Sequence, residues 1–253
     1  MRNIACCAGA VLPLMSCAVL PLMIWTAPVG HAEPVPAPAI APCPDVEVVF
    51  ARGTFEPAGV GQIGQSFIDA LTARAAGRSV DIYPVDYPAS LDFATAADGV
   101  ADAANKVRDT VARCPDTKIV LGGYSQGAAV AAYITEDAVP AGFTLPPGIT
   151  GPLPPSVADH VAAVALFGKP SSGFLQMIYT GAPPIDVGSR FTTKTIDLCI
   201  PQDPVCSPTG SDNTAHTQYA DNGMTDQAAQ FAVAHLQQGV AGGQVLSQSA
   251  AHR

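Results

Sequence analysis

Charged residues are scarce in this chain, and basic residues are scarcer than acidic ones. Only 13% of the 253 residues are charged, and 12 lysines and arginines stand against 21 aspartates and glutamates. Because no basic stretch interrupts this acidic balance, the composition argues against binding to nucleic acid or to an anionic membrane surface. Apolar residues make up 48% of the sequence. That fraction predicts a compact core and a surface suited to neutral or apolar partners.

Metal-ligand patterns are also missing. The sequence has no C-x-x-C motif and no paired histidines, so its spacing indicates neither a metal site nor a cofactor. Of the seven cysteines, three lie within the first 17 residues, and an even number remains: Cys43, Cys114, Cys199 and Cys206. Four cysteines allow three disulfide connectivities. A short proline-containing loop separates Cys199 from Cys206, so a local bridge is the simplest choice there, which pairs Cys43 with Cys114.

The first 32 residues have the features of a secretory signal peptide. They open with Arg2, carry an apolar stretch and end in Gly30-His31-Ala32, with small residues at positions −3 and −1 of the expected cleavage. Pro13 and Pro21 interrupt the stretch, which argues against a stable membrane anchor. A lipoprotein anchored through Cys17 is a minor alternative, because that cysteine lies inside the apolar stretch rather than at its end. We therefore expect a secreted, extracellular protein, with association to the cell envelope left open.

Composition divides the rest of the chain into three parts. Residues 33–42 form a spacer rich in Pro and Ala. Residues 43–236 are expected to form one domain, in which the Pro- and Gly-rich segment 140–155 is a surface insertion. Residues 237–253 are rich in Gln, Gly, Ser and Ala, and we expect a disordered tail there.

Strand-like and helix-like segments alternate within the domain. Apolar runs at 46–50, 80–85, 118–121, 161–167 and 194–198 predict strands, and helices are expected around 63–75, 96–112, 128–134 and 227–236. Several of the strands are apolar throughout, which is typical of a parallel sheet buried on both faces. The pattern therefore predicts the α/β class, with a central parallel sheet flanked by helices on both faces.

A Gly-Tyr-Ser-Gln-Gly motif at residues 123–127 lies between a predicted strand and a predicted helix. A serine with glycines two residues away on either side is typical of a nucleophile elbow, because larger side chains at those positions would collide with neighbouring backbone. Such a turn exposes the hydroxyl and points the next backbone N–H toward a developing oxyanion. Chance G-x-S-x-G matches are common in Gly-rich chains, but the strand–motif–helix context favours Ser125 as a nucleophile.

A serine nucleophile needs a general base and a carboxylate that orients the base. Four histidines follow the motif, and three of them are candidates for the base. His235 falls in a predicted helix, and His160 precedes a strand at the end opposite to a catalytic loop. His216, in a polar loop late in the chain, is the best candidate for the base.

The carboxylate is expected between a strand and His216. Asp203 meets this condition, and the predicted Cys199–Cys206 bridge would fix its loop. Asp197 falls inside a strand, and Asp212 is too close to the histidine along the chain. A turn-forming Asp-Pro is the alternative explanation of Asp203.

Together these residues resemble the cutinase family of secreted serine esterases. The motif at 123–127, the Cys-x-x-x-Asp-Pro-x-Cys loop and the late histidine are joined by Ala51-Arg52-Gly53-Thr54-Phe55-Glu56, Cys43-Pro44-Asp45 and Asp86-Tyr87-Pro88-Ala89. The last two segments are similar to those of actinobacterial members. The resemblance runs from about residue 43 to 236. It implies a small α/β-hydrolase without a large lid, a Ser125–Asp203–His216 triad, and an oxyanion hole formed by the backbone N–H groups of Thr54 and Gln126. The insertion at 140–155 and the apolar segment 174–179 depart from compact cutinases.

The resemblance implies a carboxylic-ester hydrolase that works without a cofactor through an acyl-enzyme. We expect a monomer that acts on neutral short-to-medium-chain acyl esters, with polyesters and lipids as further substrates. Two alternatives remain open: a lipase or phospholipase acting on long-chain envelope lipids, and a catalytically silent binding or antigenic protein with the same fold.

Overall fold

The computed structural model describes residues 42–141, 143 and 145–250. The predicted signal peptide and all but the last residue of the spacer lie outside these residues. In the part that is described, no helix is both long and apolar enough to cross a membrane.

A five-stranded sheet forms the centre of the domain. All its neighbouring strands pair in parallel, in the order β2-β1-β3-β4-β5. The strands are β1 Val46–Ala51, β2 Val80–Pro84, β3 Lys118–Tyr124, β4 Val161–Phe167 and β5 Thr195–Leu198. The three inner strands are almost wholly buried, whereas the edge strands β2 and β5 carry exposed polar positions. Continuous apolar runs therefore mark the inner strands, as expected for a sheet covered on both faces.

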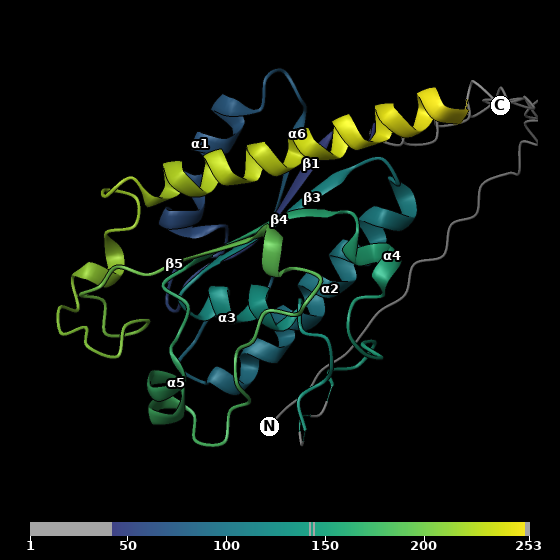
Figure 1. Ribbon diagram of the computed structural model, residues 1–253. Coiled ribbons are helices and arrows are strands. Elements are labelled where there is room, and N and C mark those ends of the chain that lie inside the picture. Colours follow the sequence, from purple (N-terminus) through teal and green to yellow (C-terminus); the bar gives the residue numbers. More distant parts are fainter. Residues whose placement is uncertain (1–41, 142, 144, 251–253) are drawn as a thin grey trace, which may run out of the picture. The chain divides into compact units, whose positions relative to one another are not determined.

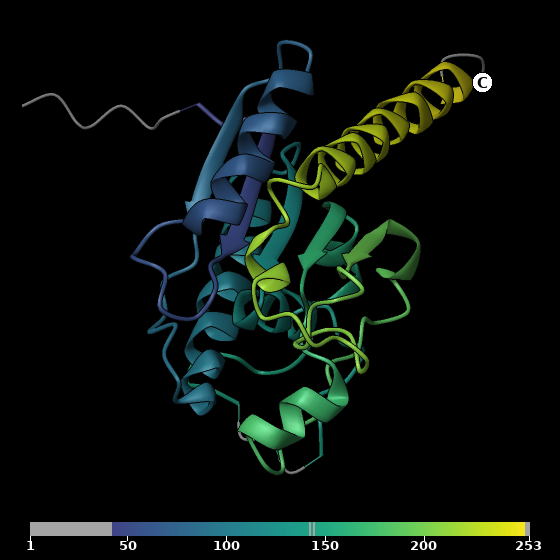
Figure 2. The same cartoon turned by 90° about the vertical axis from the view of Figure 1, so that its left-hand side faces the viewer.

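Helices cover both faces of this sheet (Figures 1 and 2). On one face, α1 (Gly61–Arg74) and α6 (Met224–Ala250) pack on the strands, and the ring of Phe67 in α1 contacts those of Phe50 and Phe167. On the other face, α2 (Ala96–Arg113) and α3 (Gln126–Tyr133) bury mostly small side chains against the strands. Successive residues of each inner strand contribute to opposite cores, because strand side chains alternate. The α/β class with a parallel sheet and helices on both faces is confirmed.

Shorter elements lie in the connections. These are the helices α4 (Pro155–Ala158) and α5 (Ser172–Ile178), and the 3-10 turns η1 (Phe93–Thr95), η2 (Thr192–Lys194) and η3 (Ala215–Thr217).

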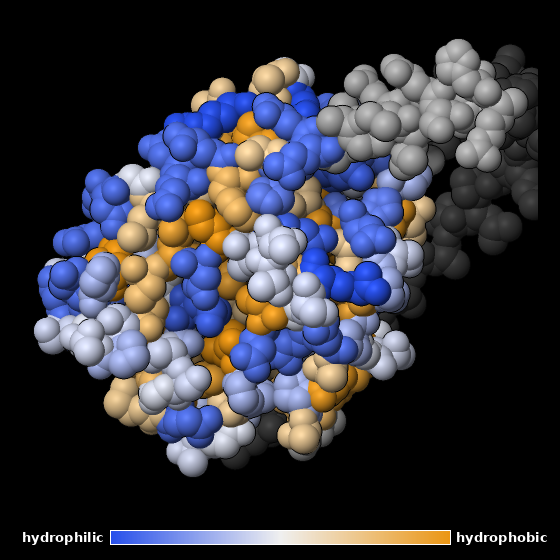
Figure 3. Space-filling view, viewed as in Figure 1, coloured by the Kyte–Doolittle hydropathy of each residue, from blue (hydrophilic) through white to orange (hydrophobic). Residues whose placement is uncertain are grey.

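Polar and apolar side chains are interspersed over the face seen in Figure 3 rather than gathered into one apolar area.

The structure differs from expectation in two segments. The last helix starts at Met224 and continues to Ala250, through residues 237–250 for which composition predicts disorder. Ala, Gln, Leu and Val in this stretch tolerate helix, and α6 simply extends the part that packs on the sheet. The segment 140–155 is more than a surface insertion, because Ile149 and Leu153 are buried in the core on the α2 side. Their apolar side chains cover that helix.

Both predicted disulfides are present. Cys43–Cys114 joins the start of the domain to the end of α2, across 71 positions of sequence. Cys199–Cys206 closes a loop directly after β5, across 7 positions. The first bridge ties two distant parts of the chain, and the second shapes a single loop.

Removing the two bridges is expected to destabilise the protein unequally. In the chain-entropy model, replacing Cys43 and Cys114 by serine costs about 4 kcal/mol of unfolding free energy, and replacing Cys199 and Cys206 costs about 2 kcal/mol. Urea unfolding of the two double variants measures both values. Equal losses, or two titratable thiols in the unreduced, denatured wild type, would contradict this assignment.

Candidate active site

Ser125 lies on the tight turn between β3 and α3, at the carboxyl end of a central strand. Its φ of 55° and ψ of −118° are a strained conformation for a residue with a side chain. A Cβ at Gly123 would lie 2.0 Å from the carbonyl oxygen of Gly127, and a Cβ at Gly127 would lie 2.0 Å from that of Ala51. Both glycines are therefore required sterically. The strand–turn–helix context predicted for the motif is present.

His216, on η3, lies between Ser125 and Asp203. Its Nε2 is 2.8 Å from the Ser125 Oγ, and its Nδ1 is 2.7 Å from the Asp203 Oδ2. An ionised carboxylate only accepts hydrogen bonds, so Nδ1–H donates to Asp203. The neutral ring then leaves Nε2 to accept the serine proton. The structure brings together the three residues that the sequence selects.

Asp203 is fully buried, with 0% exposure, yet it is well supplied with donors. Besides His216, the Tyr219 hydroxyl donates to Oδ2 at 2.6 Å and the Val205 N–H donates to Oδ1 at 2.8 Å. Burial alone would raise the pKa of Asp203. The hydrogen bonds from His216, Tyr219 and Val205 outweigh it and hold that pKa below its ordinary value. The carboxylate therefore stays ionised while buried.

Two tyrosines hold this chain of groups in place. Tyr124 precedes the serine, and its hydroxyl donates to the backbone oxygen of His216 at 2.6 Å, while its ring lies 5.0 Å from the imidazole. Burial raises the pKa of both Tyr124 and Tyr219, so both remain neutral donors. Sequence reasoning missed both roles. The only signal was their position inside the two motifs that carry the serine and the histidine.

Gln126, one of the two expected oxyanion donors, is the first residue of α3 and is 1% exposed. Backbone N–H groups in the first turn of a helix have no partner inside the helix, so the Gln126 N–H, next to the serine, has none there. The Gln126 side chain is held separately, since its Nε2 donates to the Ser90 carbonyl at 3.0 Å.

Thr54, the other expected donor, lies in the loop after β1, beside the turn that carries the serine. Paired β1 and β3 end together, with Ala51 opposite Gly123. A Cβ at Gly53 would lie 2.6 Å from the ring of Tyr124, so the loop contacts the residue before the serine. Both expected oxyanion donors thus lie at the same edge of the sheet as Ser125.

The charged side chains of Arg52 and Glu56 fix the Thr54 loop through hydrogen bonds. The Glu56 carboxylate accepts from the Gly53 N–H at 2.6 Å. Arg52 donates to the Glu56 carbonyl at 2.9 Å and to the Tyr87 carbonyl at 2.7 Å. These bonds explain the arginine and the acid of the Ala-Arg-Gly-Thr-Phe-Glu segment: they fix the backbone on which Thr54 sits.

The histidines and aspartates that sequence analysis did not select as base and carboxylate lie away from Ser125 or have other partners. His160 precedes β4 at the amino end of the strand, and His235 lies in α6, where its ring contacts the carbonyls of Phe231 and Thr193. Asp197 pairs with Lys169 at 3.4 Å, and Asp212 accepts from the N–H of Thr214 at 2.8 Å. None of the four takes part in the hydrogen-bond chain of Ser125. Among the described residues, no three His, Cys, Asp or Glu side chains gather in a way that could hold a metal ion.

An apolar cavity opens beside Gln126. It encloses about 490 Å³ of space free of protein atoms, part of it open to solvent, between α3, the start of α2 and α5. Ala129 and Tyr133 line it from α3, and Leu175 lines it from α5. Ser125 itself keeps partial exposure. Its lining includes Gln126, the residue that follows Ser125.

A serine, a histidine and a buried carboxylate at the carboxyl edge of a parallel sheet are arranged as in serine hydrolases of the α/β-hydrolase class. Known proteins make the assignment narrower. The family model described as Cutinase matches residues 42–236. The chain belongs to the cutinase family, and it is a carboxylic ester hydrolase.

Three similar proteins illustrate the relationship. Carboxylesterase Culp1 of Mycobacterium tuberculosis is 46% identical over 220 residues, which cover 85% of this chain and 90% of that protein. Phospholipase Culp4 of the same organism is 45% identical over 199 residues, covering 79% and 82%. The solved structure of Trichoderma reesei cutinase in complex with a phosphonate inhibitor is similar with a TM-score of 0.56 and 31% identity, covering 77% of this chain and 78% of that one.

Replacing Tyr219 by phenylalanine tests the support of Asp203. The ring stays, but the hydroxyl bond to the carboxylate is lost, and a bond to a charged group is worth about 1.5–3 kcal/mol. We expect kcat/KM for a soluble ester to fall about 10-fold or more. The pKa of Asp203 should rise toward its ordinary value. A lowered carboxyl pKa stabilises the fold above the unfolded-state pKa and loses this effect as the pH falls, so the difference in unfolding free energy should shrink in acid.

Tyr83→Phe is the matched control. Tyr83 also donates its hydroxyl to a carboxylate, that of Asp102 at 2.9 Å, but it lies on the edge strand β2. Its kcat/KM should match the wild type. Equal activity in both variants would show that Tyr219 does not support the site.

Proposed function

We propose that this protein is a secreted ester hydrolase in which Ser125 is the nucleophile, His216 the general base and Asp203 the carboxylate that orients it. The observation that carries the proposal is the chain of hydrogen bonds at 2.8 and 2.7 Å from the Ser125 Oγ through the imidazole to Asp203. Each atom in that chain has the donor or acceptor character that the reaction needs.

Acylation begins when the Ser125 oxygen attacks the ester carbonyl. His216 Nε2 takes the serine proton, and the buried Asp203 carboxylate stabilises the imidazolium that forms. The backbone N–H groups of Thr54 and Gln126 hold the negative charge on the tetrahedral oxygen. When the intermediate collapses, the alcohol leaves with the proton that His216 returns.

Deacylation repeats these steps with water. His216 takes a proton from the water as it attacks the acyl carbonyl, and the same N–H groups hold the second oxyanion. The carboxylic acid leaves and the serine regains its proton. The cycle uses only groups of the chain and water.

The substrate is an acyl ester whose acyl chain occupies the apolar cavity beside Gln126. The relatives are named for two related chemistries, a carboxylesterase and a phospholipase, so hydrolysis of lipid esters is the second candidate function. The two disulfides agree with an oxidising compartment, and with the predicted signal peptide they support export. We propose that the protein acts as a monomer.

Ser125→Ala is expected to remove ester hydrolysis while leaving the thermal midpoint almost unchanged, because a partly exposed hydroxyl adds little packing. Ser211→Ala, in an exposed part of the loop before His216, is the control and should keep full activity. Turnover of a nitrophenyl ester measures both. Residual activity of Ser125→Ala near that of the wild type would refute the nucleophile.

A fluorophosphonate probe separates the enzyme from a silent binding protein with the same fold. The wild type and Ser211→Ala should each form one covalent adduct, located at Ser125 by peptide mass spectrometry, and Ser125→Ala should form none. A wild-type protein that stays unlabelled would favour the binding protein.

Chain-length preference is the third expectation for this site. Each acyl methylene that leaves water contributes about 0.8 kcal/mol, roughly fourfold, but only while the cavity beside Gln126 has room. Rates should therefore rise from acetyl to short-to-medium acyl esters and then level off or fall. Nitrophenyl esters from C2 to C16, below and above substrate aggregation, give the profile. A maximum at C16 with a sharp increase at the lipid interface would instead indicate a lipase.

A further inference from the structure

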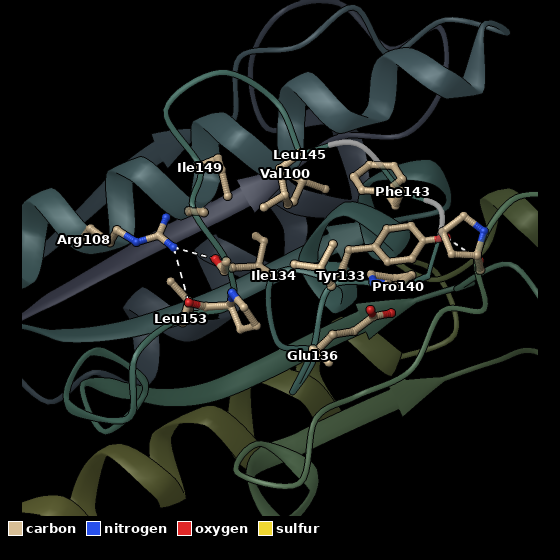
Figure 4. Close-up of a pocket in the computed structure, with 16 residues that line it drawn as sticks. Val100, Arg108, Tyr133, Ile134, Glu136, Pro140, Phe143, Leu145, Ile149 and Leu153 are labelled. Atoms are coloured by element: carbon tan, nitrogen blue, oxygen red, sulfur yellow. Dashed lines mark hydrogen bonds between the residues drawn. The ribbon is translucent and has the colours of Figure 1, made fainter.

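A second cavity lies further along α2 and α3, on the side away from Ser125. It encloses about 530 Å³ of space free of protein atoms, part of it open to solvent. Figure 4 shows Arg108 at one end, Ile134 in the middle, and Tyr133 and Pro140 toward the other end. Ile149 and Leu153, from the segment that departs from compact cutinases, complete its wall. The ester hydrolysis described above does not use this cavity.

Arg108 is the basic group of this cavity, and it forms no ion pair within the described residues. Its Nη2 donates to the carbonyls of Gly151 at 3.0 Å and Pro152 at 3.5 Å, which are neutral acceptors. Its Nη1 is buried and has no hydrogen-bond partner within the described residues. No carboxylate in that part of the chain forms an ion pair with it: the neighbouring Asp109 pairs with Arg113.

Keeping a partly buried guanidinium charged without a counter-ion costs free energy. Burial lowers the pKa of Arg108, which expresses the cost of keeping the charge away from water. Arginine nevertheless stays protonated in proteins, so the charge persists and its Nη1 lacks an acceptor among the described residues. A half-buried cation with a buried, unpaired N–H is stabilised by an anion, and a carboxylate matches the planar fork of a guanidinium.

Apart from Glu136, the rest of the wall is mostly apolar, and it continues toward the cavity beside Gln126. Val100, Tyr133 and Pro183 line both this cavity and the one beside Gln126. Along α2, the stretch from Ala97, in the cavity beside Gln126, to Arg108 spans about 16 Å at 1.5 Å per residue. That length is close to the hydrocarbon thickness of one membrane leaflet, about 15 Å, which one lipid acyl chain fills.

The carboxyl group of Glu136, which also lines the cavity, does not neutralise Arg108. Glu136 accepts from the Asp186 N–H at 3.3 Å and lies apart from the guanidinium in Figure 4. Burial raises the pKa of Glu136 to about 7, so it carries only part of a negative charge near neutral pH. An anion held at Arg108 would meet little repulsion from it.

We propose that this cavity binds the anion of a medium- or long-chain fatty acid, with its carboxylate on Arg108 and its alkyl chain along Ile134 and Tyr133 toward the cavity beside Gln126. The ligand is an amphiphile because the site has one cationic end and an apolar body. A fatty acid is also what hydrolysis of a lipid ester releases, so the cavity is a second site for a product of the same chemistry. A chain held there would compete for the wall that the two cavities share.

Decanoate, kept below the concentration at which it self-associates, is the probe. Isothermal titration of the protein should show one saturable site. Arg108→Gln should weaken decanoate at least tenfold, whereas Arg190→Gln, which removes an exposed arginine outside the cavity, should leave it unchanged. The titration needs no turnover, so its result is independent of whether Ser125 is the nucleophile.

Two ligand comparisons in the wild type separate the charge from the apolar contact. Decanol, which has a chain of the same length and no charge, should bind at least tenfold more weakly than decanoate. Butanoate should bind at least 100-fold more weakly, because each buried methylene is worth about fourfold. In Arg108→Gln, decanol and decanoate should bind alike.

Hydrolysis of a nitrophenyl acetate by every variant checks that it is folded, because the acetyl group does not reach Arg108. Equal decanoate affinity in the wild type and in Arg108→Gln would overturn the proposal, as would decanol binding as tightly as decanoate. Absence of saturable decanoate binding to the wild type would overturn it as well. If Arg108→Gln does not fold, the comparison of decanoate with decanol in the wild type decides.

Discussion

A steric constraint at one turn determines where everything else in the site has to be. Ser125 occupies a positive φ between two glycines whose Cβ atoms would lie 2.0 Å from backbone oxygens. Because Gly127 touches the end of β1, the turn fixes the start of α3 against the sheet and sets the loop of Thr54 beside it. The central position of β3 then places the serine among three loops rather than at an edge of the fold. The carboxyl ends of parallel strands meet there, as is general for sites in open α/β sheets.

The buried carboxylate is the second requirement, and the fold meets it with hydrogen bonds rather than with a counter-ion. Asp203 receives donors from a histidine, a tyrosine and a backbone N–H within a loop that a disulfide closes. This differs from Arg108, which is half-buried and whose hydrogen-bond partners among the described residues are neutral carbonyls. The same chain thus contains a satisfied buried anion at one site and an unsatisfied cation at another. We associate the first with catalysis and the second with a ligand.

Local sequence signals were enough to predict most of the fold and the turn that carries the serine. The apolar runs predicted all five strands, the glycine spacing predicted the turn at Ser125, and cysteine spacing predicted both bridges. The roles of Ser125, His216 and Asp203 stay predictions, although the structure brings the three side chains together. Contacts between residues far apart in the chain left no local signal. The Tyr124 bond to His216 and the burial of Leu153 against α2 depend on how distant segments meet. Composition likewise underestimated α6, because Gln and Ser tolerate helix when a packed helix already leads into them.

The bond from Tyr124 to the backbone of His216 has a consequence for motion. Tyr124 is adjacent to the serine in sequence, and its hydroxyl holds the main chain of the histidine at 2.6 Å. We therefore expect a thermal displacement of the strand end to carry the imidazole along with the hydroxyl, so that Ser125 and His216 fluctuate in a correlated way. Their separation varies less than the position of either one. Misplacement of about 1 Å can cost a hundredfold in rate, so the proposed proton transfer depends on a bond that keeps these two groups together.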